Sequence, residues 1–381
     1  MSLKYSFLLS LCSLIIISVS PIIAQTSFRP KALVIPVVKD AATLQYVAEI
    51  KQTTPLVPVK LTVHLGGYVS STNKIARCGS AQCNLANVKA CGGGICGADP
   101  ENPISNTGTF GDIRIDVLSI QSTNSRNPGR AVTVLNFIFL CGSEFVLQGL
   151  ANGVVGIAGL GRSKVALPSQ LAAAFSLKTK FALYLSPFGN GVIIFGDGPY
   201  DLNFDVSNTA SGFLGEPSVK YFIGVASVNV NGKAISTVNP YTVLETSMYK
   251  AFVQAFANAM PKVTRVAPVA PSRACFRLQD IGFTRIGPFV PQIDLVLQNK
   301  NVYVVWSVHG QNSMVQIGND VLCLRFVDGG VNPRTSIVIG GRQLENNLLQ
   351  FDLAHIKTWL GNSLLFERTT CSNFNLTSNI A

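Results

Sequence analysis

The chain has 381 residues, of which 48% are hydrophobic and only 13% are charged, a composition that can bury a large core and excludes a disordered protein. Lysine and arginine number 30 against 19 aspartates and glutamates, for a formal net charge of +11. The basic residues are scattered and no basic run alternates with aromatic residues, so a nucleic-acid partner is not expected. The excess charge suits solubility or retention in an acidic extracellular matrix.

The N-terminus predicts secretion. Lys4 precedes an apolar stretch at residues 7–19, which is shorter than the roughly 20 residues of a membrane span. Ala24 then leads into polar residues, so we expect a signal peptide at residues 1–24 rather than an uncleaved anchor. No later segment is long and apolar enough to cross a membrane, so we expect an extracellular protein. The length of the chain corresponds to about two domains.

Short apolar runs between turn residues predict an all-β chain. Valines within residues 225–230 lead into Asn231-Gly232, a strong signal for a β-hairpin. Further strands are expected at residues 60–63, 137–140, 192–195, 294–297 and 302–306.

Two helices are expected among these strands. Pro168 opens the first, because proline is favoured in the first turn, and this helix continues to Phe175. The second begins near Thr246 and stops at Pro261. It carries large apolar side chains at four-residue steps, which predicts a face packed on the core. These side chains are Met248, Phe252, Phe256 and Met260.

Eight cysteines remain after Cys12 leaves with the signal peptide. In a secreted protein they are expected to form disulfides. Four of them crowd into one segment, at Cys78, Cys83, Cys91 and Cys96. A zinc site is the competing interpretation, but the spacing lacks a Cys-x-x-Cys pair and no histidine lies nearby. The four cysteines allow three pairings, among which the sequence does not choose.

A weak two-fold repeat runs through the chain. The segment around His64 is followed about a hundred residues later by an apolar, glycine-containing strand at 154–161. The segment around Ser236 is followed at a similar distance by a comparable strand at 336–341. A boundary between two halves is expected in the polar stretch 207–218.

This arrangement resembles pepsin-like peptidases, in which each lobe has an Asp-Thr/Ser-Gly turn backed by an apolar-apolar-Gly strand. The chain is more closely similar to the plant inhibitor branch of that fold, which includes xyloglucanase inhibitors, extracellular dermal glycoprotein, basic 7S globulins and cereal xylanase inhibitors. The resemblance is carried by TLQY at 43–46, TPLVPV at 54–59, GLGR at 159–162, FGDGPY at 195–200, ISTVNPYTVLE at 235–245 and NPRTS at 332–336. It extends from about residue 31 to residue 377.

The resemblance implies an all-β, bilobal pepsin-like aspartic peptidase fold. It places an N-terminal lobe of the xylanase-inhibitor type at residues 32–210 and the matching C-terminal lobe at residues 216–378. It also implies secretion to the plant cell wall, or apoplast.

Both catalytic aspartate positions of that fold hold other residues. Aspartic peptidases need two carboxylates that share a proton and activate a water between them. His64 stands at the first position and Ser236 at the second, so no carboxylate dyad can form. Val238 also replaces the glycine of the second turn, which removes a close backbone approach. Glu245 is the nearest carboxylate in sequence but is no evident substitute, so we expect no peptidase activity.

Two segments that the resemblance leads us to expect are missing. Relatives continue the first Gly-Gly into a strand with a Leu-Trp-Val-Asp-Cys-like segment, whereas Gly67 leads directly to Tyr68. A second gap follows Lys233. Deletions are therefore expected in both lobes. Either the strand order of the first lobe is rewired, or that lobe is weakened by unpaired backbone groups, or the translated sequence lacks coding segments.

The resemblance also bears on the remaining cysteines. It pairs Cys275 with Cys323 in the second lobe. Tyr184 stands where relatives carry a cysteine, so Cys141 and Cys371 are left without assigned partners.

The function implied by the resemblance is inhibition of a secreted glycoside hydrolase, either a xyloglucan-specific endoglucanase or a xylanase. An arginine on an inhibitor loop could pair with the two catalytic carboxylates of such an enzyme. The candidates are Arg265, before a proline-rich run, and Arg334, beside Pro333. The alternatives are a basic 7S globulin-like binding or storage protein with a peptide or cell-surface partner, and an endopeptidase with residual activity.

Two further features complete the expectations. Asn375 begins the one clear N-glycosylation sequon, Asn-Leu-Thr, which suits a secreted glycoprotein. His64, His309 and His355 are far apart and lack metal-ligand spacing, so no metal and no cofactor are expected.

Overall fold

The structure is a computed structural model, and it describes most of the chain between Phe28 and Asn373. The described residues are 28–61, 70–88, 90–102, 104–105, 107–124, 127–188, 190–198, 209–211, 234–235, 240–297, 304–333, 335–355 and 357–373. The expected signal peptide, the Asn231-Gly232 hairpin and the sequon at Asn375 lie outside these residues.

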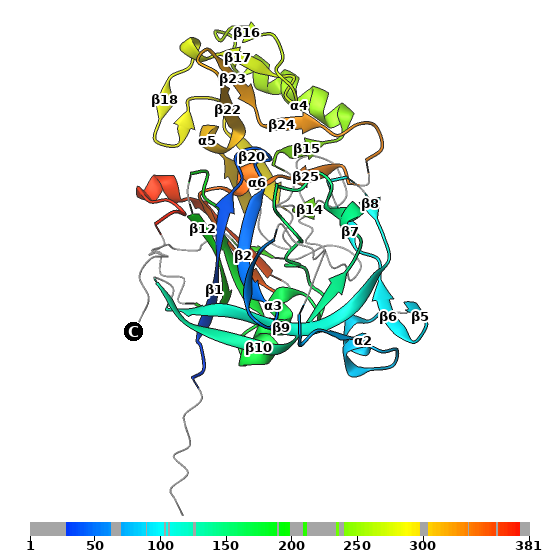
Figure 1. The fold of residues 1–381 in the computed structure, drawn as a ribbon. Coiled ribbons are helices and arrows are strands. Elements are labelled where there is room, and N and C mark those ends of the chain that lie inside the picture. The colour runs from blue at the N-terminus through cyan, green and yellow to red at the C-terminus, as the bar shows by residue number, and fades with distance from the viewer. Residues whose placement is uncertain are drawn as a thin grey trace, which may run out of the picture.

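One large sheet organises most of the first half of the chain (Figure 1). Its main path runs β13-β27-β26-β11-β12-β1-β2-β9-β6-β5, and β10, β3 and β4 pair beside that path. The strands from the first half are β1 (Ala32–Lys39), β2 (Tyr46–Gln52), β3 (Val57–Leu61), β4 (Lys74–Ile75), β5 (Ala90–Gly92), β6 (Ile95–Ala98), β9 (Gly111–Thr123), β10 (Pro128–Cys141), β11 (Lys180–Tyr184) and β12 (Asn190–Gly196).

Strands from the end of the chain complete the same sheet. They are β26 (Asn347–Asp352) and β27 (Lys357–Ser363), with the short β13 (Thr209–Ser211) at the edge. Because β26 pairs with β11, the C-terminal residues are hydrogen-bonded into the sheet begun by β1. Phe181 of β11 stacks on Phe351 of β26 with ring centroids 4.6 Å apart, so the junction is also packed.

Smaller sheets occupy the opposite end of the molecule (Figure 1). The first comprises β14 (Ala234–Ile235), β25 (Ile337–Ile339), β15 (Thr242–Leu244) and β24 (Phe326–Asp328). The second comprises β16 (Arg265–Val266), β17 (Cys275–Arg277), β23 (Val321–Leu324) and β22 (Met314–Ile317). The two-stranded sheets at this end are β18 (Phe283–Thr284) with β19 (Gly287–Pro288) and β20 (Ile293–Leu297) with β21 (Val304–Val308). A further two-stranded sheet, β7 (Glu101–Asn102) with β8 (Thr107–Gly108), belongs to the first half of the chain.

The described parts of the predicted strands at 60–63, 137–140, 192–195, 294–297, 302–306 and 336–341 are confirmed, and so are both predicted helices, whereas the segment 154–161, also predicted as a strand, forms none. Helix α3 (Leu167–Phe175) has Pro168 in its first turn, and α4 (Thr246–Asn258) ends before Pro261. Phe256 of α4 is buried, as is Met260 two residues beyond the helix, while Met248 and Phe252 pack against the same core. The shorter helices are α2 (Ala81–Ala86), α5 (Gly310–Ser313) and α6 (Gly341–Leu344), with 3₁₀ turns at Glu144–Leu147, Leu278–Asp280 and Leu364–Glu367.

The two-fold repeat also has a structural counterpart. In the first half, the Val155 N–H donates to the Lys60 carbonyl of β3 at 3.1 Å. In the second half, β14 pairs in parallel with β25, which sets Ile235 opposite Ile339. Gly340 follows β25, and a Cβ there would lie 2.2 Å from the Tyr241 carbonyl carbon. A glycine is therefore required at position 340 for the close approach of the backbone after β25 to the backbone at Tyr241.

Two side chains near the first expected gap contain buried polar atoms without partners among the described residues. Strand β3 ends at Leu61, and the described part of the chain resumes at Ser70. Gln52 at the end of β2 is fully buried, and neither its amide oxygen nor its amide nitrogen has a hydrogen-bond partner among the described residues. The Asn73 side-chain oxygen is unpaired in the same way. Each such group costs stability, because it has lost water without gaining a protein partner.

We expect Gln52→Leu to stabilise the protein by about 1–3 kcal/mol, since it replaces an unpaired buried amide with an apolar group of similar volume. Thermal unfolding followed by circular dichroism measures the change. Gln170→Leu is the matched control, because the Gln170 amide is equally enclosed but bonds to Ile138 and Val165 at 2.7 Å. That control should be destabilised. A lower unfolding midpoint for Gln52→Leu would contradict the interpretation.

Candidate functional site

The two positions at which we expect catalytic aspartates to be replaced follow strands β3 and β14. His64 and Ser236 lie outside the described residues, so their side chains have no geometry here. Strand β3 ends three residues before His64, and β14 ends directly before Ser236. The hydrogen bond from Val155 to Lys60 of β3 and the pairing of β14 with β25 therefore lie beside positions that carry no carboxylate.

Glu245, the nearest carboxylate in sequence to the second position, has a different task. Its side chain caps helix α4, accepting from the Ser247 N–H at 2.9 Å and the Met248 N–H at 3.2 Å. The hydrogen bond from the Ser247 hydroxyl, and after it these two N–H bonds, hold the pKa of Glu245 below its usual value. A carboxylate held in its charged form by a helix N-terminus serves as a cap and is not a substitute for a catalytic aspartate.

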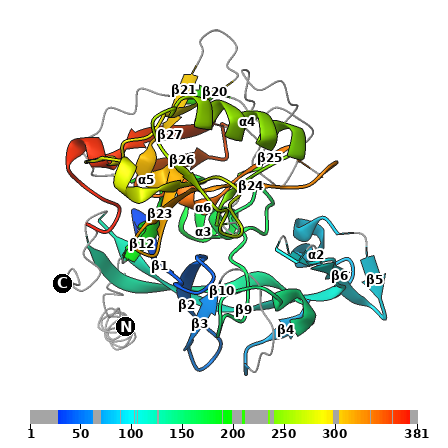
Figure 2. The same ribbon diagram turned by 90° about the horizontal axis from the view of Figure 1, so that it is seen from above.

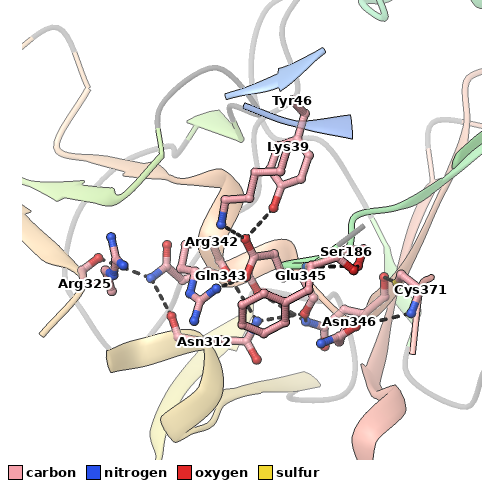
Figure 3. Close-up of polar contacts among 12 residues, drawn as sticks. Lys39, Tyr46, Ser186, Asn312, Arg325, Arg342, Gln343, Glu345, Asn346 and Cys371 are labelled. Carbon is pink, nitrogen blue, oxygen red and sulfur yellow. Dashed lines mark hydrogen bonds and ion pairs between the residues drawn. The ribbon is translucent and has the colours of Figure 1, made fainter. Parts of the chain in front are cut away.

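A buried cluster of charges lies where the first strands meet the last part of the chain (Figure 3). Glu345 follows α6 and its side chain is fully buried. One carboxylate oxygen accepts from the Lys39 ammonium of β1 and from the Tyr46 hydroxyl of β2. The other oxygen accepts from the Arg342 guanidinium. Both oxygens are thus held by donors from three different elements.

Burial and charge together determine the protonation of this cluster. Burial lowers the pKa of Lys39, and the Glu345 carboxylate acts in the opposite direction by favouring the ammonium form. Burial also raises the pKa of Tyr46, and the same carboxylate raises it further, so the phenol stays a donor. One anion is therefore shared by two cations and a neutral hydroxyl.

Side-chain amides hold the backbone on the other side of Glu345. The Asn312 amide of α5 donates to the Arg342 carbonyl at 2.9 Å and to the Glu345 carbonyl at 2.8 Å. The Gln343 amide donates to the carbonyls of Asn312 and Arg325, at 3.1 and 3.2 Å. Figure 3 shows these amides bridging α6 to neighbouring segments.

The network extends to β15 and to a buried arginine. The Thr242 hydroxyl donates to the Gln343 side chain at 2.8 Å and accepts from the Gly340 N–H at 3.0 Å. Arg325 lies over the Tyr241 ring at 4.5 Å, and burial lowers the pKa of its guanidinium to about 10. The network contains one carboxylate whose oxygens are both engaged, so its chemistry is that of a structural clamp rather than an acid–base pair.

We expect Glu345→Gln to destabilise the protein by about 3–5 kcal/mol, because it leaves Lys39 and Arg342 buried without a counter-charge. Chemical denaturation measures the loss. Lys178→Ala is the control, since it removes an ion pair to Asp197 that lies on the surface and should change stability by less than about 1 kcal/mol. Equal effects of the two substitutions would show that the cluster is not a clamp.

Arg265 occupies an exposed position on β16, where its backbone is held on both sides. It pairs with Phe276 of β17, and the Arg277 N–H donates to the Thr264 carbonyl at 2.8 Å. The Thr264 N–H donates to the Asp280 carboxylate at 2.8 Å. No ion pair engages Arg265 within the described part of the chain. Arg334, the second candidate, lies outside the described residues, so its position relative to Arg265 is not described.

Three disulfides are present among the described residues. Cys78 pairs with Cys91 and Cys83 with Cys96, which selects one of the three pairings open at the sequence level. Cys275 pairs with Cys323, joining β17 to β23 beside Arg265.

Cys141 and Cys371 are free thiols of different accessibility. Cys371 is buried beside Tyr184 in a small apolar cluster of the large sheet, whereas Cys141 is half-buried at the end of β10. Burial raises the pKa of the Cys371 thiol well above its usual value.

We expect one thiol of the mature native protein to react readily with a thiol reagent at pH 8, and a second to react only after unfolding. The reactive group is Cys141, because the Cys371 thiolate is disfavoured and enclosed. Absorbance titration with an aromatic disulfide counts the groups, and Cys141→Ser identifies the first. Rapid reaction of two thiols in the native state would contradict the placement of Cys371.

The histidines that the structure describes do not form a metal site. His309 packs edge-on against Phe366, and burial lowers the pKa of its imidazole. His355 pairs with Asp352 at 2.9 Å. Among the residues whose positions are described, no group of three metal-ligating side chains occurs, and no helix is long and apolar enough to span a membrane.

Sequence reasoning missed the Glu345 cluster. Lys39 and Glu345 are separated by 306 positions, and Tyr46 and Glu345 by 299. No local spacing joins residues so far apart. A weak signal was present, since a glutamate between apolar segments of a chain with few charges needs a partner if it is buried.

Comparison with known proteins connects this architecture to a family. The Xylanase inhibitor N-terminal model matches residues 46–197, and the Xylanase inhibitor C-terminal model matches residues 225–360. A protein named Probable aspartic proteinase GIP2 from Nicotiana benthamiana is 49% identical, with 97% of each chain covered. Gamma conglutin 1 from Prunus dulcis is 41% identical over 98% of this chain and 97% of its own.

Solved structures agree in fold. The crystal structure of a protein named EDGP has a TM-score of 0.84 and 48% identity, covering 92% of this chain and all of that one. Basic 7S globulin from soybean has a TM-score of 0.80 at 34% identity, with the same coverage. An aspartic proteinase from Irpex lacteus, 11% identical, has a TM-score of 0.59 over 89% of this chain and 99% of its own, which shows the pepsin-like fold alone.

The alignment with the Nicotiana protein bears on the expected gaps. It extends over 428 residues, whereas this chain has 381, so the relative carries segments without a counterpart here. This agrees with the expectation of missing segments and does not locate them.

Proposed function

Because the chain belongs to the xylanase-inhibitor-type family of pepsin-fold proteins, we propose that it acts outside the cell as an inhibitor of a secreted glycoside hydrolase, a xyloglucan-specific endoglucanase or a xylanase. The single observation that carries the proposal is Arg265. It is an exposed cation on a strand with a fixed backbone, with no acidic partner among the described residues.

Inhibition would follow from the geometry of the target. Retaining glycosidases hold two carboxylates about 5–5.5 Å apart in a cleft that admits a polysaccharide. A guanidinium is planar and offers parallel N–H donors, so it can bind a carboxylate through two hydrogen bonds and also remains charged. An arginine delivered to these carboxylates blocks substrate and removes the free base or nucleophile.

The surroundings of Arg265 suit such a role. The segment after β16 closes back on itself, since the Ser272 N–H donates to the Val269 carbonyl at 3.0 Å. Its return strand β17 is fixed to β23 by the Cys275–Cys323 disulfide. A cation on a preorganised support loses less conformational entropy on binding than one on a free loop. Arg334 remains a second, weaker candidate for the same interaction.

The same proposal includes the absence of peptidase chemistry. His64 and Ser236 supply no carboxylate pair, and Glu245 is engaged as a helix cap. A basic, secreted protein in the plant cell wall without catalytic aspartates could reach a microbial hydrolase during defence. No metal or cofactor is needed for occlusion.

A second candidate function rests on the relatives rather than on the site. Gamma conglutin and basic 7S globulin are similar over most of the chain, and the net charge of +11 also suits an extracellular binding or storage protein. Its partner would be a peptide or a cell-surface protein. Recovery of such a partner from a cell-wall extract, with no effect on either hydrolase, favours this alternative.

We expect the purified protein to inhibit a xyloglucanase or a xylanase, and Arg265→Ala to weaken inhibition at least tenfold through loss of the charge-assisted contact. Inhibition constants from reducing-sugar release measure this. Arg130→Ala is the control, because Arg130 is an exposed arginine on β10, at the opposite end of the molecule (Figure 1).

Two outcomes would contradict the proposal. One is no inhibition of either hydrolase by the unaltered protein. The other is pepstatin-sensitive cleavage of a denatured protein at acid pH, which would restore the peptidase interpretation.

A further inference from the structure

A short hairpin near Arg265 exposes two phenylalanines around an arginine. Strands β18 and β19 place Phe283 opposite Pro288, and the Phe289 N–H donates to the Gly282 carbonyl at 2.8 Å. Phe283 is 61% exposed and Phe289 is 77% exposed. Arg285, in the turn between the strands, is exposed and has no ion-pair partner among the residues that the structure describes. Apolar rings left this open in a secreted protein indicate a surface that a partner covers.

The hairpin is rigid because its base is packed tightly. A Cβ at Gly287 would lie 2.2 Å from the Gln311 nitrogen, and a Cβ at Gly310 would lie 2.0 Å from the Pro288 oxygen. The Gln311 N–H donates to the Ile286 carbonyl at 2.8 Å, and the Thr284 hydroxyl donates to the Gly287 carbonyl at 2.9 Å. The hairpin is therefore clamped onto α5, and its exposed side chains are displayed from a fixed backbone.

The charge around the hairpin defines the chemistry of its partner. Between residues 262 and 285, five basic side chains and one aspartate, Asp280, are exposed. The basic residues are Lys262, Arg265, Arg273, Arg277 and Arg285. From outside this segment, Asp328 pairs with Arg273 at 3.8 Å, and the exposed Asp320 lies beside Leu278, so the basic residues still outnumber their acidic neighbours. Asp280 is already occupied by the Thr264 N–H. A surface of this charge attracts an acidic partner and disfavours a second copy of the same basic chain.

Arg265 and the hairpin are close enough to share one partner. Figure 1 places β16 and β18 at the same end of the molecule. Arg265 lies opposite Phe276, about 5 Å away as strand partners do, and the seven residue steps from Phe276 to Phe283 span at most about 24 Å. A standard interface of about 800 Å² per partner is a patch about 32 Å across, which accommodates both.

We propose that the β18–β19 hairpin, through Phe283, Arg285 and Phe289, is a second docking element for the acidic glycoside hydrolase whose carboxylates Arg265 engages. This inference rests on the proposed function. Aromatic and arginine side chains on a fixed backbone are the composition typical of interface hot spots. The hairpin anchors the complex beside the cleft, and Arg265 acts on the catalytic carboxylates.

The test compares two paired variants of equal chemistry. Phe283→Ser with Phe289→Ser removes the proposed anchor, and Phe110→Ser with Phe145→Ser removes two phenylalanines that are 51% and 50% exposed in the first half of the chain. Dissociation constants for an immobilised microbial xyloglucanase and a xylanase are measured by surface plasmon resonance. We expect the hairpin variant to bind at least about tenfold more weakly than the control variant, with inhibition still complete at saturating concentration.

Arg285→Ala gives an independent reading that does not depend on the fold of the double variant. It should slow association and flatten its dependence on salt. Unchanged dissociation constants for both hairpin variants, with hydrolase inhibition intact, would overturn the hairpin inference and leave the proposed function standing. Loss of self-association in the hairpin variant, with unchanged hydrolase binding, would also overturn it. Absence of binding and inhibition by the unaltered protein would instead remove the proposed function, and this inference with it.

Discussion

The carboxylate of Glu345 connects the start of the chain to its end. Lys39 and Tyr46 reach it from the first two strands, and Arg342 reaches it from the last short helix. Because the carboxylate is fully buried, each donor offsets a desolvation penalty that no water can relieve. In the view of Figure 2, α6 lies between β1 and β2 on one side and β26 on the other, so the cluster holds together the region where these elements meet.

The large sheet, like the Glu345 cluster, connects the C-terminal strands to the first strands. The large sheet continues from β1 through β12 and β11 into β26, so the C-terminal strands are part of the framework on which the first strands depend. The smaller sheets then rise from this framework with Arg265 and the β18–β19 hairpin at their far end (Figure 1). The large sheet provides a fixed framework, and the smaller sheets carry exposed basic and aromatic side chains at their far end. This arrangement suits the presentation of a rigid surface to a partner.

The charged residues of this chain are arranged differently from the carboxylate pair expected in a pepsin-like peptidase. We expect His64 and Ser236 to stand where a pepsin-like peptidase holds two carboxylates, and the nearby Glu245 serves as a helix cap. The charge that remains exposed beyond the core is mainly positive, with +11 over the chain. An excess of positive charge on a surface favours the approach of acidic partners.

Local patterns determined a large part of this protein. The helices at 167–175 and 246–258, the apolar stripe ending at Met260 and most strands followed from periodicity, proline positions and turn residues, which act over a few residues. The presence of histidine at position 64 and serine at position 236, on which the expected loss of the catalytic pair rests, is likewise a property of the sequence alone. Tertiary structure decided which of three disulfide pairings forms, that Glu245 is a cap, and that Gln52 is buried without a partner. It also decided that Lys39 and Glu345, 306 positions apart, share a buried ion pair, because only the closure of the sheet brings such distant charges together and removes the water between them.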